Sequence, residues 1–144
     1  MTPRWIDSPD ALNEIVAAVS RVERYAIDTE FHRERTYYPR LALVQIAWDD
    51  EVVLVDPLAT DPKMLAPLFE SPALAVFHAA QQDLDVLAHT VGVVPEHLFD
   101  TQLAAAFVGY STPSLVNLTR GELDIVPSKG DRLTDWLARP LTDA

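Results

Sequence analysis

Two acidic side chains stand two positions apart in a segment with the composition of a β-strand. Because side chains alternate along a strand, Asp28 and Glu30 point to one face. The other face takes Ile27, Thr29 and Phe31. At about 3.3 Å per residue the two acidic Cα atoms are about 6.6 Å apart, so both carboxylates can reach one metal ion or two ions about 4 Å apart. The spacing also fits a solvated strand face, but the apolar neighbours indicate an interior strand, where a cation would offset the cost of burying carboxylates.

A third acidic residue lies in a segment with helical periodicity. The apolar stripe of this helix must face the sheet, and it consists of Ala80, Leu84, Leu87 and Val91. Asp83 lies about 70° from the centre of the stripe and flanks the sheet, whereas Asp85 lies about 130° away and faces water. A catalytic role and capping of the first helical turn fit Asp83 equally well on this local pattern.

One basic and aromatic segment follows the acidic pair directly. It runs from His32 to Arg40 and holds three of the eleven basic residues together with Tyr37 and Tyr38. Arginine forks suit phosphate oxygens, and tyrosine faces suit unstacked bases. An isolated patch of this kind is more typical of a solvated loop. Its position beside the carboxylates favours a segment that guides a single strand.

The elements that must position these residues alternate between strands and helices. A helix is expected after Ser8 and Pro9, which are a cap and a first-turn proline. Further expected elements are strands over 25–31, 41–48, 51–55, 74–78 and 98–100, and helices over 64–69, 80–91 (ended by Gly92) and 101–107. Residues 110–132 are expected to be loop-rich with one helical turn near Leu115. Three strands followed by strand–helix alternation predict an α/β fold, a mixed β-sheet flanked by helices.

Length and composition exclude several classes of protein. The 144 residues fit one domain, and the formal charge of -11 argues against a general electrostatic grip on polyphosphate, so any nucleic acid must be held locally. The absence of cysteine removes disulfides and thiolate metal sites. Four glycines without a phosphate-cradling array argue against a nucleoside triphosphate or dinucleotide site. Apolar runs too short for a bilayer predict a cytoplasmic protein without a membrane partner.

A long stretch of the chain resembles the ribonuclease D family. Residues 28–31, continuing through 33–41 and 45–47, closely resemble the first exonuclease motif of that family, and residues 78–84 resemble the second. Residues 99–102, 135–136 and 139–141 resemble its later stretches. The resemblance implies a ribonuclease H-like fold of the DEDD superfamily. It also implies two divalent cations, Mg²⁺ or Mn²⁺, and removal of nucleotides from single-stranded RNA 3′ ends, with tRNA precursors as the expected substrates.

The resemblance assigns roles to residues of this sequence. Asp28 and Glu30 become metal ligands, and Asp83 becomes the third catalytic and metal-binding acid. The side chains expected to contact nucleic acid are Thr29, Phe31, His32, Arg33, Arg35, Tyr38, His78 and Gln82. A preference for RNA over DNA is not assigned to any residue.

The sequence departs from the family near its end. The third motif of the family supplies a tyrosine and a fourth acid, but Tyr110 is the last tyrosine here and Asp143 lies too early to match that acid. We therefore expect residues 1–144 to form a single 3′-5′ exonuclease domain that is incomplete at its C-terminus, without the helical RNA-binding (HRDC-type) domain. Such a chain would be a weakened or inactive fragment of the exoribonuclease. The alternative is a non-catalytic RNA-binding or interaction module of the same fold.

Overall fold

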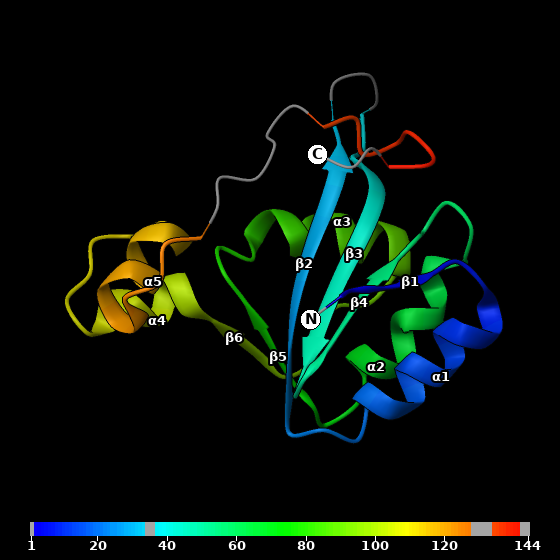
Figure 1. The fold of residues 1–144 in the computed structure, drawn as a ribbon. Coiled ribbons are helices and arrows are strands. Elements are labelled where there is room, and N and C mark those ends of the chain that lie inside the picture. The colour runs from blue at the N-terminus through cyan, green and yellow to red at the C-terminus, as the bar shows by residue number, and fades with distance from the viewer. Residues whose placement is uncertain (1, 34–36, 128–133, 142–144) are drawn as a thin grey trace.

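A mixed six-stranded sheet forms the centre of the computed structural model, which describes residues 2–33, 37–127 and 134–141 (Figure 1). Its strands are β1 (Arg4–Ile6), β2 (Arg24–His32), β3 (Arg40–Trp48), β4 (Glu51–Val55), β5 (Leu74–Phe77) and β6 (Leu98–Asp100), in the spatial order β1-β4-β3-β2-β5-β6. The pairs β2–β3 and β3–β4 are antiparallel, whereas the pairs β1–β4, β2–β5 and β5–β6 are parallel. This confirms the expected mixed sheet with its three-strand meander.

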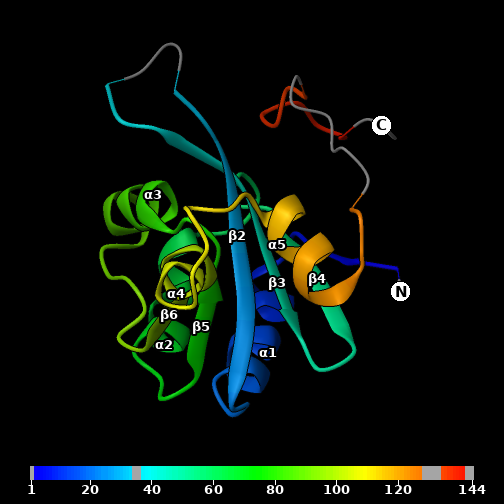
Figure 2. The ribbon, with the colours of Figure 1, turned by 90° about the vertical axis from the view of Figure 1, so that its left-hand side faces the viewer.

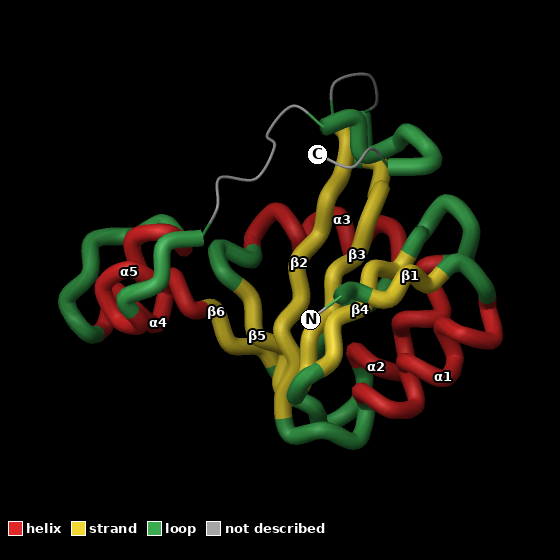
Figure 3. The backbone as a smooth tube through the Cα atoms, in the orientation of Figure 1, coloured by secondary structure: helices red, strands yellow, loops and turns green. Residues whose placement is uncertain are grey.

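Helices cover mainly one face of this sheet. They are α1 (Pro9–Val19), the 3₁₀ helix η1 (Pro62–Leu65), α2 (Ala66–Phe69), α3 (Gln81–Val91), α4 (Thr101–Phe107) and α5 (Leu115–Leu123). Figure 2 shows α2 and α3 on one side of β2 and α5 on the other. In the tube view α4 and α5 lie together beyond the edge strand β6 (Figure 3). The core lies between the sheet and the layer of α1 to α3, where Leu12, Ile46, Leu68 and Leu87 are fully buried.

The helix boundaries follow from local chemistry. The hydroxyl of Ser8 caps α1, which buries the predicted apolar face that begins at Leu12. The helix α3 ends at Gly92, whose φ of 94° is a left-handed conformation that glycine adopts without steric cost. Both features confirm what the sequence pattern predicts.

Two elements differ from the expectation. The strand β1 is only three residues long and pairs with β4 alone, so it has no detectable periodicity. The helix α5 spans nine residues instead of one turn. Gly121 within it argues against a helix on propensity, but a Cβ there would stand 3.0 Å from the hydroxyl of Tyr110, so the glycine permits a close tertiary approach. The end of the expected loop, residues 128–132, lies outside the described residues, as does Asp143.

An ion pair between a buried carboxylate and a half-buried arginine anchors residues 134–141 to the sheet. The guanidinium of Arg139 donates to both carboxylate oxygens of Asp56, at 2.8 and 2.7 Å, and to the carbonyl of Ala42 at 2.7 Å. Glu30 pairs with Leu43 and Phe31 with Leu41, which makes Ala42 an extra, bulged residue of β3. The hydrogen bonds from Arg139 hold the pKa of the Asp56 carboxyl below its usual value.

We predict that Arg139→Ala lowers the free energy of unfolding by about 3 kcal/mol, because it leaves a buried carboxylate without its partner. Urea unfolding at pH 7 measures this loss. The matched control is Arg24→Ala, whose ion pair with Glu23 is exposed, with an expected loss below about 0.5 kcal/mol. Since the folded-state pKa of Asp56 is lowered, its contribution is present above the unfolded pKa and is lost as pH falls through the folded pKa. Equal losses in the two variants would contradict the anchoring role.

Candidate active site

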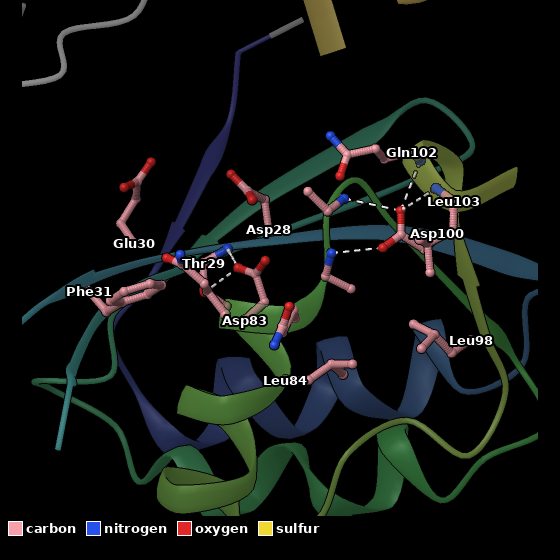
Figure 4. A pocket seen from close by; sticks show the side chains of 14 residues that line it. Asp28, Thr29, Glu30, Phe31, Asp83, Leu84, Leu98, Asp100, Gln102 and Leu103 are labelled. Atoms are coloured by element: carbon pink, nitrogen blue, oxygen red, sulfur yellow. Dashed lines mark hydrogen bonds between the residues drawn. The ribbon is translucent and has the colours of Figure 1, made fainter. Parts of the chain in front are cut away.

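The three predicted acids line one hollow of about 900 Å³ beside the middle of β2 (Figure 4). Asp28 and Glu30 come from β2, and Asp83 comes from the first turn of α3. Three residues expected to contact nucleic acid line the same hollow: Thr29, Phe31 and Gln82. The structure therefore brings together residues from both segments that resemble exonuclease motifs.

The hollow exists because β2 loses one of its neighbours halfway along. The pairing of β2 with β5 ends at Ala26, whereas its pairing with β3 continues to His32. Residues 27–32 of β2 therefore have an edge without a strand partner. The backbone N–H of Thr29 and its hydroxyl donate to Oδ1 of Asp83 across this edge, at 3.1 and 2.5 Å. The open edge explains why residues of both strand faces line the hollow.

The connection from β5 into α3 is held by Asp100, which the sequence analysis did not single out as a site residue. Ala79 has a φ of 61°, a strained value for a residue with a side chain. The Asp100 carboxylate accepts from the N–H of Ala79 at 3.1 Å and of Ala80 at 2.9 Å, and it also caps α4 by accepting from Gln102 and Leu103. Two signals were available: an aspartate immediately before a helical segment, which indicates a cap, and the family resemblance of residues 99–102, which assigned no role to Asp100.

The electrostatics of Asp100 differ from those of the other acids in the hollow. Burial by itself would raise the pKa of Asp100, but the N–H donors of Ala80, Ala79, Gln102 and Leu103 outweigh burial and lower the pKa. The carboxylate is therefore stabilised as an anion and is fully engaged in holding the entrance of α3. It serves to position Asp83 on the open edge of β2.

The other three carboxylates repel one another. Burial raises the pKa of Asp28, and the charge of Asp83 raises it further. Burial, then the charges of Asp28 and Asp83, raise the pKa of Glu30 to about 7. Burial raises the pKa of Asp83 although the two hydrogen bonds from Thr29 oppose the shift. A cation bound among these carboxylates would relieve the repulsion.

The donor set fits hard divalent cations. Carboxylate oxygens are the ligands that Mg²⁺ prefers, and Mn²⁺ takes similar sites. Within the described ranges, no three Asp, Glu, His or Cys side chains are arranged so that together they could hold a metal ion. The three acids thus line one hollow and repel one another there, without being arranged as a finished metal site.

His78 follows β5 directly and lines a neighbouring hollow of about 490 Å³, which Asp28 and Leu115 of α5 also line. The hydroxyl of Thr101 donates to the carbonyl of Phe77 at 3.0 Å and lies 2.9 Å from Nδ1 of His78. Because that hydroxyl has only one proton, Nδ1 of His78 must donate to it. The other ring nitrogen, Nε2, is buried and has no hydrogen-bond partner in the part of the chain that the structure describes.

The remaining predicted contact residues lie apart from the acids. Arg33 and Tyr38 line a third hollow, between the β2–β3 connection and α3. His32 is half-buried at the end of β2 and lines none of these three hollows. Arg35 lies outside the described residues.

The model of the 3′-5′ exonuclease family matches residues 3–144. Ribonuclease D of Gluconacetobacter diazotrophicus is 42% identical over 150 residues, which cover 99% of this chain and 37% of that protein. Ribonuclease D of Escherichia coli is 39% identical over 149 residues, which cover 99% and 39%. The chain spans well under half the length of these curated relatives.

Solved structures agree with the sequence matches. The crystal structure of Escherichia coli RNase D, described as an exoribonuclease involved in structured RNA processing, superposes with a TM-score of 0.93 at 37% identity, over 99% of this chain and 39% of that one. The catalytic core of RRP6 from Trypanosoma brucei superposes with a TM-score of 0.90 at 26% identity, over 99% and 40%. Fold and matched residues thus define the class, a 3′-5′ exonuclease domain. The chain belongs to the ribonuclease D family within that class, which confirms the resemblance seen in the sequence.

Two general properties accompany this membership. The 3′-5′ exonuclease family of the DEDD type generally depends on divalent metal ions. Within the described residues, none of the helices has the length and apolar character needed to cross a bilayer.

We predict that Glu30→Gln stabilises the metal-free protein at pH 8 but not at pH 5. The folded-state pKa of Glu30 is about 7, above the ordinary glutamate value of 4.5, so the wild-type chain loses stability as pH rises through this window. Allowing for solvent screening, we expect a gain of about 1 kcal/mol at pH 8, or about 3 °C in Tm. Thermal unfolding in EDTA measures it.

The matched control is Glu14→Gln, on the exposed side of α1, for which we expect no pH-dependent difference. Saturating Mn²⁺ should reverse the order at pH 8, since the wild-type protein then gains binding energy that the variant lacks. A Glu30→Gln effect of equal size at pH 5 and pH 8 would contradict the repulsion described above.

Proposed function

We propose that this protein is a metal-dependent 3′-5′ exoribonuclease. The observation that carries the proposal is the convergence of Asp28, Glu30 and Asp83 on one hollow in a chain of the ribonuclease D family. The names of the relatives, and the description of the Escherichia coli enzyme as an exoribonuclease, support RNA as the substrate. Processing of tRNA 3′ ends and a cytoplasmic location remain predictions from the sequence.

The acids would hold two divalent ions, Mg²⁺ or Mn²⁺. Asp28 would be shared between the ions, Glu30 would bind one, and Asp83 would bind the other directly or through water. When bound, the ions supply Lewis-acid chemistry, which lowers the pKa of a water molecule and polarises the phosphate. Thr29 already holds Oδ1 of Asp83, which orients this carboxylate and leaves Oδ2 for a cation.

Other residues of the hollow would bind the RNA end. Phe31 lines the hollow and would stack on the terminal base. Gln82 is exposed at the start of α3 and would donate to or accept from the nucleotide. The guanidinium of Arg33 stands 5.3 Å from the centre of the Phe31 ring, where it would hold a phosphate. His78 would contact the RNA from the neighbouring hollow, which Asp28 also lines.

One observation favours a second candidate function, an RNA-binding module without turnover. The hollow contains a fourth carboxylate, that of Asp100, but its engagement with four backbone N–H groups prevents it from serving as the fourth metal-binding acid. The family resemblance implies a tyrosine and an acid from a third motif in addition. For residues 1–144 alone, the first candidate predicts that RNA is bound and turned over slowly, and the second predicts that RNA is bound without turnover.

The test uses single-stranded RNA labelled at its 3′ or 5′ end, with Mg²⁺ or Mn²⁺. We expect stepwise shortening from the 3′ end, at least about 100-fold slower in Asp28→Asn, because loss of the shared carboxylate loosens both ions. Asp50→Asn, at the exposed β3–β4 turn, is the matched control and should keep the wild-type rate. A chain lengthened by a third exonuclease motif should be much faster, and EDTA should stop it.

Several outcomes separate the candidates. Binding of RNA without cleavage by the lengthened chain favours the module, and equal rates for Asp28→Asn and the wild type would refute the metal mechanism. If a matched DNA strand is shortened faster than the RNA, the protein is a deoxyribonuclease rather than a ribonuclease.

A further inference from the structure

A separate hollow of about 570 Å³ lies outside the acidic site, between the β2–β3 connection and the outer side of α3. Its lining residues are Arg33, Tyr37, Tyr38, Pro39, Asp85, Ala88 and His89. Figure 2 shows this end of the β2–β3 hairpin on the same side of β2 as α3. A volume of several hundred cubic ångströms is that of a small-molecule site, and none of the three proposed metal ligands lines it.

Aromatic rings are the first chemical feature of this hollow. The Tyr38 ring stacks on His89 of α3, with ring centroids 4.0 Å apart and an interplanar angle of 13°. Tyr37 meets Tyr38 edge to face, with centroids 4.9 Å apart, and is itself 93% exposed. One ring is thus braced by the helix and positions another whose face is open. An open aromatic face next to a braced ring is a platform on which a nucleobase can stack.

A carboxylate is the second feature. Asp85 points away from the sheet, as the helix periodicity predicts, yet it lines this hollow rather than facing bulk water alone. A carboxylate repels phosphate and accepts from N–H groups, so it suits the edge of a base. Guanine presents two adjacent donors, N1–H and the N2 amino group, which match the two oxygens of one carboxylate. Uracil presents a single N–H donor.

Arg33 connects this hollow with the acidic site. Its guanidinium lies over the ring of Phe31, which lines the acidic hollow, and the Arg33 side chain also lines the third hollow. An arginine between two nucleotide-sized hollows is placed to hold the phosphate that joins their occupants. Two nucleotides of one strand would then occupy the acidic hollow and the third hollow.

We propose that this third hollow is a subsite for the base of an upstream nucleotide and that it prefers guanine. Tyr37 stacks on the base, Asp85 accepts from its amino edge, and Arg33 holds the neighbouring phosphate. The proposal rests on the proposed function for its ligand, single-stranded RNA. It does not depend on cleavage, because the subsite uses no proposed metal ligand.

The experiment measures binding of this chain to pentauridylate RNAs in EDTA, where no cleavage occurs. One guanine replaces uracil at each position in turn. We expect a single upstream position at which guanine strengthens binding about tenfold. Guanine at that position should shift the ring NMR signals of Tyr37, Tyr38 and His89. Asp85→Asn should reduce the preference to less than about twofold, and Tyr37→Ala should weaken binding of every oligonucleotide.

Two control variants are matched in type and exposure. Phe107→Ala removes another ring, 92% exposed and outside all three hollows, and Asp50→Asn removes another surface carboxylate. Both should bind like the wild type. Absence of a guanine preference at every position, or a preference that survives in Asp85→Asn, would overturn the subsite. If RNA is shortened but no guanine preference exists, the proposed function stands and this inference is wrong. If a guanine preference exists but RNA is not shortened, the subsite stands and the proposed exoribonuclease function is wrong.

Discussion

The hydrogen bonds from Thr29 to Asp83 join two segments that are 54 residues apart, and the acidic hollow depends on them. Bringing three carboxylates of like charge together costs free energy. The raised pKa values of Asp28 and Glu30 reflect this cost, because burial and the neighbouring charges disfavour their ionised forms. Thr29 supplies an N–H and a hydroxyl that favour the ionised form of Asp83 and fix its position. The remaining repulsion among the three carboxylates favours the binding of cations in the hollow.

The rest of the fold holds these bonds in place. Because β5 ends before β2 does, the N–H of Thr29 has no strand partner and is available to Asp83. Asp100 stabilises the left-handed Ala79 and so sets where α3 begins. On the other side of the sheet, Arg139 uses the bulge at Ala42 to secure residues 134–141. Each device satisfies a backbone group that the irregular geometry would otherwise leave unpaired.

Much of the fold could be predicted where one element carries its own signal. The cap at Ser8, the strand β4 and the stop at Gly92 follow from side-chain chemistry within a few residues. The sequence did not reveal β1 or the full length of α5. The strand β1 is defined by its partner β4 rather than by its own three residues. Within α5, Gly121 lies close to the hydroxyl of Tyr110, and local propensity cannot anticipate such a tertiary contact.

By itself the sequence determined that Asp28 and Glu30 share a strand face and that Asp83, rather than Asp85, turns toward the sheet. These are consequences of periods of two and 3.6 residues, which are local. Only the tertiary structure decided that β2 has an open edge, that Asp100 is occupied by backbone N–H groups, and that Asp85 shares a hollow with Tyr37. Those facts depend on where neighbouring strands and loops end. The free energy that places them comes from packing between residues distant in the chain.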